Sequence, residues 1–505
     1  MQIEPAPDAF AARYARGEPQ VVWTTLVADL ETPVSTFLKV AGGRPMSFLF
    51  ESVEGGAARG RYSIIGLDPD LVWRANGESA AINRSARAKP DAFSPCAERP
   101  LQALRALIAE SRIALPDALP PMAAGLFGYL GYDMVRLMEE LPPVKADPIG
   151  MPDAVMIRPT VVIVFDAVKD TVTVVTPVRP EPAVKADAAL NRAAERIAAI
   201  VEALDRPLDK EAIGREAGPV TVPPTSNTTP DEFKTMVARA KEYIAAGDIF
   251  QVVLSQRFEA PFALSPFSLY RALRRVNPAP FLFYLDYGGY AIAGSSPEIL
   301  VRVRDGTVTV RPIAGTMPRG ETPHEDKAFE DRLLADPKER AEHLMLLDLG
   351  RNDVGRVAEI GTVKVTDQFF IERYSHVMHI VSNVEGKLGA RHDALDALAA
   401  GFPAGTVSGA PKVRAMQIID ELEKEKRGLY AGSVGYFSAA GEMDTCIVLR
   451  TALVKDGKMY VQAGAGIVAD SDPGFEQQEC VNKAKALFRA AEEARRFASA
   501  AKRGQ

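Results

Sequence analysis

The segment Gly214–Thr229 is rich in proline, glycine, threonine and serine, and it separates two long stretches with regular hydrophobic patterns. This composition is typical of a linker or of a surface crossing between domains. A chain of 505 residues is also too long for one ordinary hydrophobic core. The sequence therefore predicts an N-terminal domain over residues 1–213, a linker over 214–228 and a second domain over 229–505.

Helical and strand patterns are mixed in the first domain, which predicts an α+β structure. The β-branched runs Val161–Phe165 and Thr171–Val175 flank a short polar segment, as expected for a β-hairpin. An alanine-rich stretch over Lys185–Leu204 predicts a helix directly after this hairpin.

The second domain opens with a strong helix-start signal. Thr229 is an N-cap residue, Pro230 suits the first helical position, and Glu232 stands at the position that completes a capping box. This helix should end at Gly247 and lead into a strand over Ile249–Phe258, because glycine commonly terminates helices. Strands and helices then alternate up to a closing helix, which we expect over Glu479–Lys502.

Charge and cysteine content exclude several classes of protein. The net charge is −6 and no basic block is evident, which argues against a nucleic-acid-binding protein. Cys96, Cys446 and Cys480 lie far apart, which indicates a reducing compartment without a disulfide framework. The N-terminus lacks a secretory pattern and no apolar run is long enough to span a membrane, so we expect a cytoplasmic protein without membrane partners.

Two short acidic patterns are candidates for metal binding. Glu339 and Glu342 are three residues apart and share a helix face, and Glu476 and Glu479 repeat that spacing, with Lys483 one turn further. Together the two faces would offer the hard oxygen ligands that Mg²⁺ prefers. Each pattern alone is more often a solvated helix face with salt links.

Two glycine-rich segments are candidates for ligand binding. Pro312–Thr316 follows the β-branched run Thr307–Val310, and Gln462–Gly466 follows the run Met459–Val461. Both are therefore predicted to be strand ends, where glycine lets the backbone present N–H groups to carboxylate oxygens. Tight turns are the alternative explanation for such glycines.

Four isolated polar residues are further candidates. Glu298 lies in a predicted turn after an apolar strand, where burial would raise its pKa and suit it to be a general acid. Arg450 follows a predicted strand over Cys446–Leu449 and is a natural bidentate partner for a carboxylate, or else part of a structural ion pair. His379 fits an acid, a base or a hydrogen-bonded core histidine, and Tyr430 remains a polar candidate without an assigned role.

The second domain resembles the chorismate-binding enzyme family over the family's whole length. That family includes anthranilate, aminodeoxychorismate, isochorismate and salicylate synthases, and the resemblance implies large antiparallel sheets packed together, helices outside and two intertwined subdomains. Seven ordered blocks carry the resemblance, and chance agreement of that many is negligible. The blocks are Gly294–Glu298, Pro312–Gly320, Glu339–Asp353, Tyr374–Gly386, Phe402–Gln417, Arg427–Phe437 and Gln462–Lys483.

The resemblance implies a Mg²⁺ cofactor and a chorismate pocket. Glu342 and Glu479 correspond to direct metal ligands, with Glu339 and Glu476 near the metal, and the metal would hold the ring carboxylate of chorismate. The residues that would bind the enolpyruvyl carboxylate are Tyr430, Arg450, Gly464 and Gly466. Those that would line the pocket are Gly315, Thr316 and Lys483, and those that would take part in catalysis are Glu298, His379, Thr316 and Lys483.

In this scheme Glu298 protonates the leaving C4 hydroxyl while nitrogen adds at C2, and His379 assists near that hydroxyl or in the later elimination.

Two positions select among family members. Ala314 stands where aminodeoxychorismate synthases usually carry a nucleophilic lysine, and Gln251 stands where the water-using synthases carry a lysine base. Ammonia needs no base to become a nucleophile, so both residues favour ammonia attack and anthranilate as the product, at the first step of tryptophan biosynthesis.

A tryptophan feedback site is also implied. Leu49–Ser52 and Asn277–Phe281 resemble the two walls of that site, with Glu51 pairing with the inhibitor's ammonium. The alternative is a strand edge that packs on a proline-rich loop. The predicted inhibitor-binding residues are Glu51, Ser52, Pro280, Phe281 and Phe283.

No segment resembles a glutamine amidotransferase with a cysteine nucleophile. We therefore expect a hetero-oligomer in which a separate glutaminase subunit supplies ammonia. Three other hypotheses remain open: an aminodeoxychorismate synthase component, a non-catalytic tryptophan-sensing subunit and a structural metal-binding protein.

Overall fold

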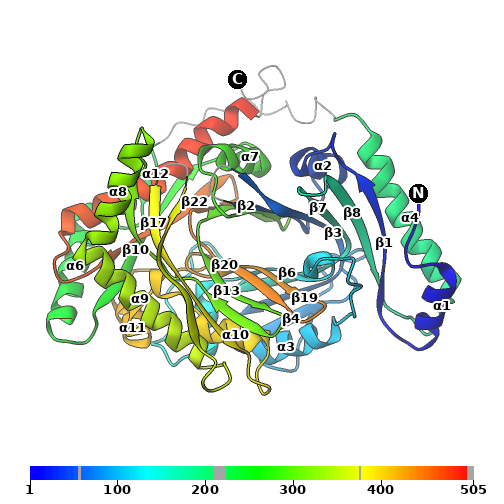
Figure 1. Ribbon diagram of the computed structural model, residues 1–505, viewed down its shortest axis with the longest axis horizontal. Coiled ribbons are helices and arrows are strands. Elements are labelled where there is room, and N and C mark those ends of the chain that lie inside the picture. Colours follow the sequence, from blue (N-terminus) through cyan, green and yellow to red (C-terminus); the bar gives the residue numbers. More distant parts are fainter. Residues whose placement is uncertain (55–57, 209–222, 375–376, 498–505) are drawn as a thin grey trace.

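The computed structural model describes residues 1–54, 58–208, 223–374 and 377–497. Curved antiparallel sheets form the interior and helices cover the outside (Figure 1). In the described residues the twenty-two strands belong to one hydrogen-bonded network, and their pairings are antiparallel. The predicted α+β class is therefore confirmed. No helix among the described residues is both long and apolar enough to cross a membrane.

The first half of the chain contributes helices to the outer layer and strands to one side of the sheet network. Its elements are α1 (Pro7–Ala15), β1 (Gln20–Val27), α2 (Pro33–Val40), β2 (Ser47–Glu54), β3 (Ala58–Asn76), β4 (Ser79–Asn83), β5 (Ser94–Pro95), α3 (Pro100–Glu110), η1 (Pro121–Ala123), β6 (Gly125–Leu130), η2 (Tyr132–Leu137), β7 (Ala154–Asp166), β8 (Thr171–Val178) and α4 (Ala186–Asp205).

The second half continues the same network. Its elements are β9 (Thr225–Ser226), α6 (Pro230–Ala245), β10 (Gln251–Pro261), α7 (Pro266–Val276), β11 (Phe281–Asp286), β12 (Tyr290–Ser296), β13 (Ile299–Arg304), β14 (Thr307–Val310), β15 (Ile313–Pro318), α8 (Pro323–Ala335), α9 (Pro337–Gly355), β16 (Lys364–Arg373), β17 (Val377–Lys387), α10 (Ala394–Gly401), η3 (Gly405–Val407), β18 (Gly409–Ala410), α11 (Lys412–Leu422), β19 (Ser433–Ser438), β20 (Met443–Ile447), β21 (Thr451–Lys455), β22 (Lys458–Ile467) and α12 (Pro473–Phe497).

The two halves are joined through strand pairing. β2 pairs with β11, and β6 pairs with β19, so the run of first-half strands β2, β3, β7 and β6 is flanked on both sides by strands of the second half. The division into residues 1–213 and 229–505 remains a prediction. Residues 214–222 of the predicted linker lie outside the described residues, and Thr225–Ser226 forms β9 against β10.

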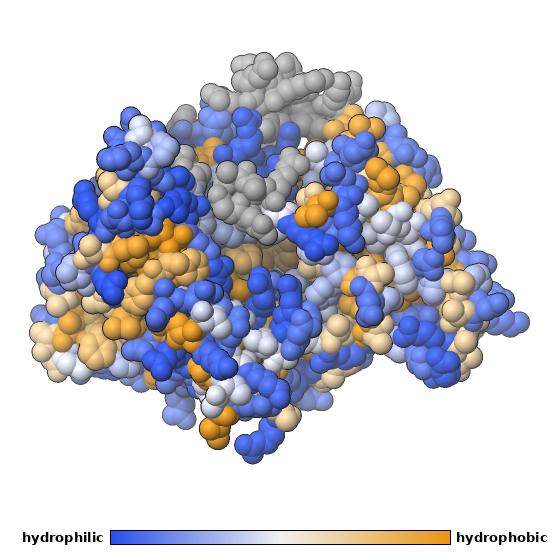
Figure 2. Space-filling model, viewed as in Figure 1, coloured by the Kyte–Doolittle hydropathy of each residue, from blue (hydrophilic) through white to orange (hydrophobic). Residues whose placement is uncertain are grey.

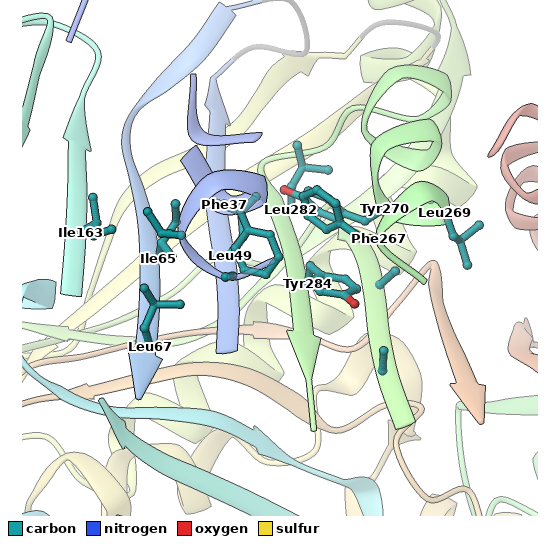
Figure 3. Close-up of a cluster of buried hydrophobic side chains, with 14 of the residues drawn as sticks. Phe37, Leu49, Ile65, Leu67, Ile163, Phe267, Leu269, Tyr270, Leu282 and Tyr284 are labelled. Carbon is teal, nitrogen blue, oxygen red and sulfur yellow. The ribbon is translucent and has the colours of Figure 1, made fainter. Parts of the chain in front are cut away.

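One large apolar cluster packs α2 and α7 onto β2, β3, β7 and β11 (Figure 3). Phe37 on α2 stacks on Phe267 on α7 with ring centroids 4.6 Å apart, and Tyr284 on β11 packs edge-on against both rings. Leu49 on β2 is fully buried in the same cluster. Burying each such side chain contributes about 1.5–3 kcal/mol, so this cluster fixes how the two halves meet.

Local sequence signals predict most elements correctly. The hairpin β7–β8, helix α4 and helix α6 with its Thr229–Glu232 capping box are confirmed. The closing helix begins at Pro473, earlier than predicted, because Asp472 accepts a hydrogen bond from the N–H of Phe475 and starts the helix. The part of that prediction after Phe497 lies outside the described residues.

Two predicted strand ends are wrong. Pro312–Thr316 follows β14, which ends at Val310 as predicted, and Gly315 lies within the next strand, β15. Gly464 and Gly466 lie within β22, because β22 continues along β10 where local propensity predicts a stop. The strand before Arg450 ends at Ile447 instead of Leu449, and Arg450 lies in the link to β21 with φ 47°.

Candidate active site

The four predicted metal-binding carboxylates lie near the beginnings of α9 and α12. Asp336 caps α9 by accepting hydrogen bonds from the N–H groups of Lys338 and Glu339. Lys338 also forms an ion pair with Asp470, at 3.0 Å, which ties the start of α9 to the loop before α12. Glu339 and Glu342 on α9 are thereby brought to the same region as the acidic residues of α12.

The charges of these carboxylates act on one another. Burial raises the pKa of Glu342, and the charges of Glu339 and Glu479 raise it further. Burial likewise raises the pKa of Glu476, with Glu479 adding to the effect. Lys483 forms an ion pair with Glu479 at 2.6 Å. The arrangement concentrates negative charge from two distant segments and balances it only in part.

The chemistry of this donor set fits Mg²⁺. Among the described residues, no three carboxylate, histidine or cysteine side chains stand close enough together to hold a metal ion as a protein cage. Mg²⁺ does not require one, since it usually takes one or two carboxylates and keeps several water molecules or substrate oxygens. Glu342 and Glu479, whose charges interact across the two helices, could supply those carboxylates.

Glu298 lies in the turn between β12 and β13, as predicted. Its carbonyl accepts a hydrogen bond from the N–H of Ile447 at 3.0 Å, which fixes the turn against β20. Burial raises the pKa of Glu298 to about 7, although Thr406, Arg450 and Lys483 act in the opposite direction. A carboxyl group with such a pKa is partly protonated at neutral pH and can donate a proton.

His379 on β17 is held against β15. Its Nδ1 lies 2.9 Å from the carbonyl oxygen of Gly315 and 3.1 Å from Oγ1 of Thr316. The imidazole also contacts the ring of Tyr374 edge-on, with centroids 5.4 Å apart. Burial lowers the pKa of His379, so the ring is neutral at physiological pH. Because the Gly315 carbonyl is an acceptor, Nδ1 carries the proton and Nε2 is left as an acceptor.

Gly315 lies close to Glu339 on α9. Gly315 has φ 71°, a left-handed conformation that favours glycine, and a Cβ there would lie 3.1 Å from Oε2 of Glu339. The backbone N–H of the neighbouring Thr316 donates to the Glu339 carboxylate and opposes the increase of its pKa that burial causes. Thr316, Gly315 and His379 are thus placed beside the carboxylate helix.

Two side chains, those of Tyr430 and Lys483, lie against Gly464 of β22. A Cβ on Gly464 would come within 2.7 Å of the Tyr430 hydroxyl, so only glycine permits this approach. Lys483 donates a hydrogen bond to the Gly464 carbonyl at 3.0 Å. A Cβ on Gly466 would lie 2.6 Å from Nε2 of Gln251, and that amide donates to Glu342 at 3.4 Å. This network links the glycines of β22 to the carboxylate of Glu342.

Arg450 is a partly buried cation that forms no salt bridge with the described residues. Burial lowers the pKa of its guanidinium, and Glu298 and Tyr374 are the groups whose charges favour the protonated form. No carboxylate in the described part of the chain forms an ion pair with it. Its φ of 47° is strained for a residue with a side chain, and such strain is concentrated at functional sites. A cation of this kind is suited to bind an anionic ligand.

The structure adds residues that the sequence analysis did not select. Arg427 is buried and donates to Glu423, to the Val253 carbonyl at 2.7 Å and to the Val407 carbonyl at 2.7 Å. Its guanidinium also lies 5.4 Å from the centroid of the Tyr430 ring. Arg427 begins one of the resemblance blocks, but nothing local distinguishes it from a surface arginine.

A cavity of about 710 Å³ lies beside this site and is lined by all five predicted inhibitor-binding residues, Glu51, Ser52, Pro280, Phe281 and Phe283. They come together because β2 and β11 pair antiparallel, with Ser52 opposite Phe281. Tyr374 and Pro297, the neighbour of Glu298, line the same cavity. Figure 2 shows one face of the molecule, on which hydrophilic and apolar residues are interspersed around a hollow near its middle.

Glu51 already has partners within this cavity. Its carboxylate accepts two hydrogen bonds from Arg274, at 2.7 and 2.9 Å, and one from the Tyr270 hydroxyl. An inhibitor ammonium would have to share this carboxylate. The Ser52 hydroxyl donates to the Tyr62 carbonyl at 3.1 Å.

Comparison with known proteins agrees with this geometry. A family model for chorismate binding enzymes matches residues 49–489. A curated relative from Cereibacter sphaeroides, named anthranilate synthase component 1, is 58% identical over 98% of this chain and 99% of its own length. A protein of the same name from Pseudomonas putida is 47% identical over 92% of this chain and 93% of its own length.

Solved structures support the same assignment. The crystal structure of anthranilate synthase component I from Streptococcus pneumoniae matches with a TM-score of 0.74 and 39% identity, over 85% of this chain and 92% of that one. The menaquinone-specific isochorismate synthase of Escherichia coli, at 20% identity and a TM-score of 0.69 over 96% of this chain and 98% of that one, shares the fold. This chain therefore belongs to the chorismate-binding enzyme family.

Proposed function

We propose that this chain is the large subunit of an anthranilate synthase, which adds ammonia to C2 of chorismate, removes the C4 hydroxyl and eliminates pyruvate. The observation that carries the choice of nucleophile is the position of Gln251. Its amide lies 3.4 Å from Glu342 and beside Gly466, in the centre of the candidate site, where water-using members of the family carry a lysine base. An uncharged amide cannot deprotonate water, whereas ammonia needs no activation. Relatives named anthranilate synthase component 1 support the same reaction.

Glu298 is the proposed general acid. Its pKa of about 7 leaves a substantial fraction protonated at neutral pH, which is the form required to release the C4 hydroxyl as water. Neutral His379, with Nδ1 directed at the Gly315 carbonyl, presents Nε2 as an acceptor for a hydroxyl or a proton from the substrate. The two groups therefore have complementary roles, one as donor and the other as acceptor.

Arg450, Tyr430 and the backbone of Gly464 and Gly466 are the proposed binding groups for the enolpyruvyl carboxylate. Arg450 supplies a buried positive charge that no described carboxylate neutralises. The hydroxyl of Tyr430 lies against Gly464, so both can reach the same oxygen atoms. Glu342 and Glu479, with Glu339 and Glu476 beside them, would hold Mg²⁺, which when bound would neutralise the ring carboxylate and withdraw electrons from the ring.

A separate subunit is the proposed source of ammonia. A glutaminase that uses cysteine needs an accessible thiol of lowered pKa. Cys446 and Cys480 are buried, and burial raises the pKa of all three cysteine thiols, that of Cys480 to about 12. None is suited to attack glutamine. Tryptophan is the proposed feedback inhibitor, bound in the cavity lined by Ser52 and Phe281.

The test is a reaction of the purified chain with chorismate, MgCl₂ and ammonium salt, monitored by anthranilate fluorescence and by chromatography. We expect anthranilate and pyruvate in equal amounts without a separate lyase. Glu298→Gln should reduce the rate at least a hundredfold, within the range for general acids, while chorismate still binds. Accumulation of aminodeoxychorismate or isochorismate would refute the proposal, and so would a wild-type rate in Glu298→Gln.

A further inference from the structure

Tyr374 lies in the wall between the large cavity and the candidate active site. On one side it lines the cavity of about 710 Å³ together with Ser52 and Phe281. On the other side its ring contacts His379 edge-on, with centroids 5.4 Å apart and an interplanar angle of 64°. A single buried ring thus separates a ligand-sized space from a residue of the proposed chemistry.

The backbone of Tyr374 is anchored, and its ring is held by contacts that face the cavity. Its carbonyl accepts a hydrogen bond from Arg319 at 2.7 Å, and its N–H donates to the Val377 carbonyl at 2.8 Å. The hydroxyl donates to Glu372 at 2.9 Å, and Glu372 forms an ion pair with Arg311. Glu372 and Arg311 also line the cavity, so an occupant meets the groups that orient this hydroxyl.

The same ring lies close to the other groups of the site. Burial raises the pKa of the Tyr374 hydroxyl, and the charges of Glu372 and Glu298 contribute to the increase. Arg450 is also within electrostatic range of Tyr374. Arg311 and Ile299 line both the cavity and the smaller pocket that contains Glu298 and Thr406. Tyr374 therefore contacts His379 and lies within electrostatic range of Glu298 and Arg450.

We propose that Tyr374 is a positioning residue through which an occupant of the cavity moves His379 and so changes turnover. The inference rests on the proposed function and names the residue that couples the two sites. An occupant that draws Tyr374 or Glu372 toward the cavity withdraws the ring from His379, which then loses its packed position against Thr316. Coupling of this kind requires that the occupant bind the two positions of the ring with different affinity.

The experiment separates tryptophan binding from tryptophan inhibition. For the wild type, Tyr374→Leu and Tyr374→Phe, the Kd of tryptophan is measured by calorimetry and its Ki in the ammonia-dependent reaction. We expect Tyr374→Leu to bind tryptophan within about threefold of the wild type but to raise Ki at least tenfold above Kd, on the scale of typical allosteric coupling. Tyr374→Phe keeps the ring and should retain coupling.

Tyr436→Leu is the matched control, because Tyr436 on β19 lines the same cavity but its ring packs against Phe127 on β6 rather than against His379. It should leave Ki equal to Kd. The inference is overturned if Ki follows Kd in Tyr374→Leu, if Tyr436→Leu uncouples equally, or if tryptophan has no effect on a wild-type enzyme that makes anthranilate. Absence of anthranilate in the wild type would instead refute the proposed function.

A second measurement tests the coupling even if Tyr374→Leu is inactive. Glu298→Gln removes turnover, so chorismate binding can be measured at equilibrium with and without tryptophan. Coupling between two binding sites is reciprocal, so tryptophan should weaken chorismate binding in Glu298→Gln. Adding Tyr374→Leu should bring that weakening close to onefold, and an unchanged factor would overturn the inference.

Discussion

Replacing Glu298 by glutamine should stabilise the protein at neutral and alkaline pH although it removes activity. Burial raises the pKa of this carboxyl from its ordinary value of 4.5 to about 7. At 1.36 kcal/mol per pKa unit, the folded state therefore loses about 3 kcal/mol of stability once the group is ionised. Glutamine keeps the shape of the side chain and is not ionised, so the variant does not carry this cost.

The sign follows from proton binding. Below the ordinary pKa of 4.5 the carboxyl is protonated in the folded and unfolded chain, and ionisation costs nothing. As the pH rises from there to about 7, the unfolded chain releases its proton first, so the folded state loses stability. The advantage of Glu298→Gln over the wild type should therefore widen by about 2 kcal/mol between about pH 5.5 and about pH 8.

Urea unfolding of the wild type and Glu298→Gln at both pH values measures this difference from the shift in midpoint and a common m-value. Glu202→Gln is the control, because Glu202 is exposed on α4 and its removal should give no pH-dependent change. An advantage that is absent, or that does not grow with pH, would show that Glu298 is ordinarily solvated and would remove the physical basis for its role as the acid.

The rate itself should depend on pH in the same sense: at constant free ammonia, kcat should fall about tenfold per unit above about pH 7 as Glu298 loses its proton, and a flat profile to pH 9 would contradict this. Ser52→Phe should fill part of the cavity and raise the Ki of tryptophan at least tenfold, with kcat nearly unchanged, since the Ser52 side chain lines the cavity and donates a hydrogen bond to the Tyr62 carbonyl; inhibition assays on both proteins decide this. Removing metal with EDTA should abolish turnover, and Glu342→Gln should raise the Mg²⁺ concentration needed to restore it; restoration at the wild-type concentration would exclude Glu342 as a ligand. Leu49→Ala should destabilise the fold by about 2–5 kcal/mol in urea unfolding, and a smaller loss would mean that the cluster under α2 can collapse around the gap.

Elements governed by neighbouring residues were predictable from the sequence. The Thr229–Glu232 capping box acts within one helical turn, and α6 begins there as expected. The spacing of Glu339 and Glu342 places both on one face of α9 for the same reason. By contrast, the predicted strand end before Gly464 is wrong, because pairing with β10 extends β22 through the glycines.

The partners of the site residues were not predictable. Glu51 is paired with Arg274, which is 223 positions away in the chain, and no local pattern indicates that pairing. Arg427 binds carbonyls of β10 and η3 and lies beside Tyr430, although as a residue type it is mostly found at the surface. The Glu51 contact arises because β2 of the first half pairs with β11 of the second, and the Arg427 contacts join segments of the second half that are distant in the chain.

The sequence by itself determined which chemical groups are present and their spacing along each element: two carboxylate pairs, an arginine, a histidine and the absence of lysine at Gln251 and Ala314. The tertiary structure alone decided which carboxyl group has a pKa near neutrality and which carboxylate charges interact. A pKa depends on burial and on nearby charges, and both depend on segments distant in the chain. Burial raises the pKa of Glu298 while Thr406 and Arg450 lower it, and Glu479 raises the pKa of Glu342, because the fold brings these distant segments together.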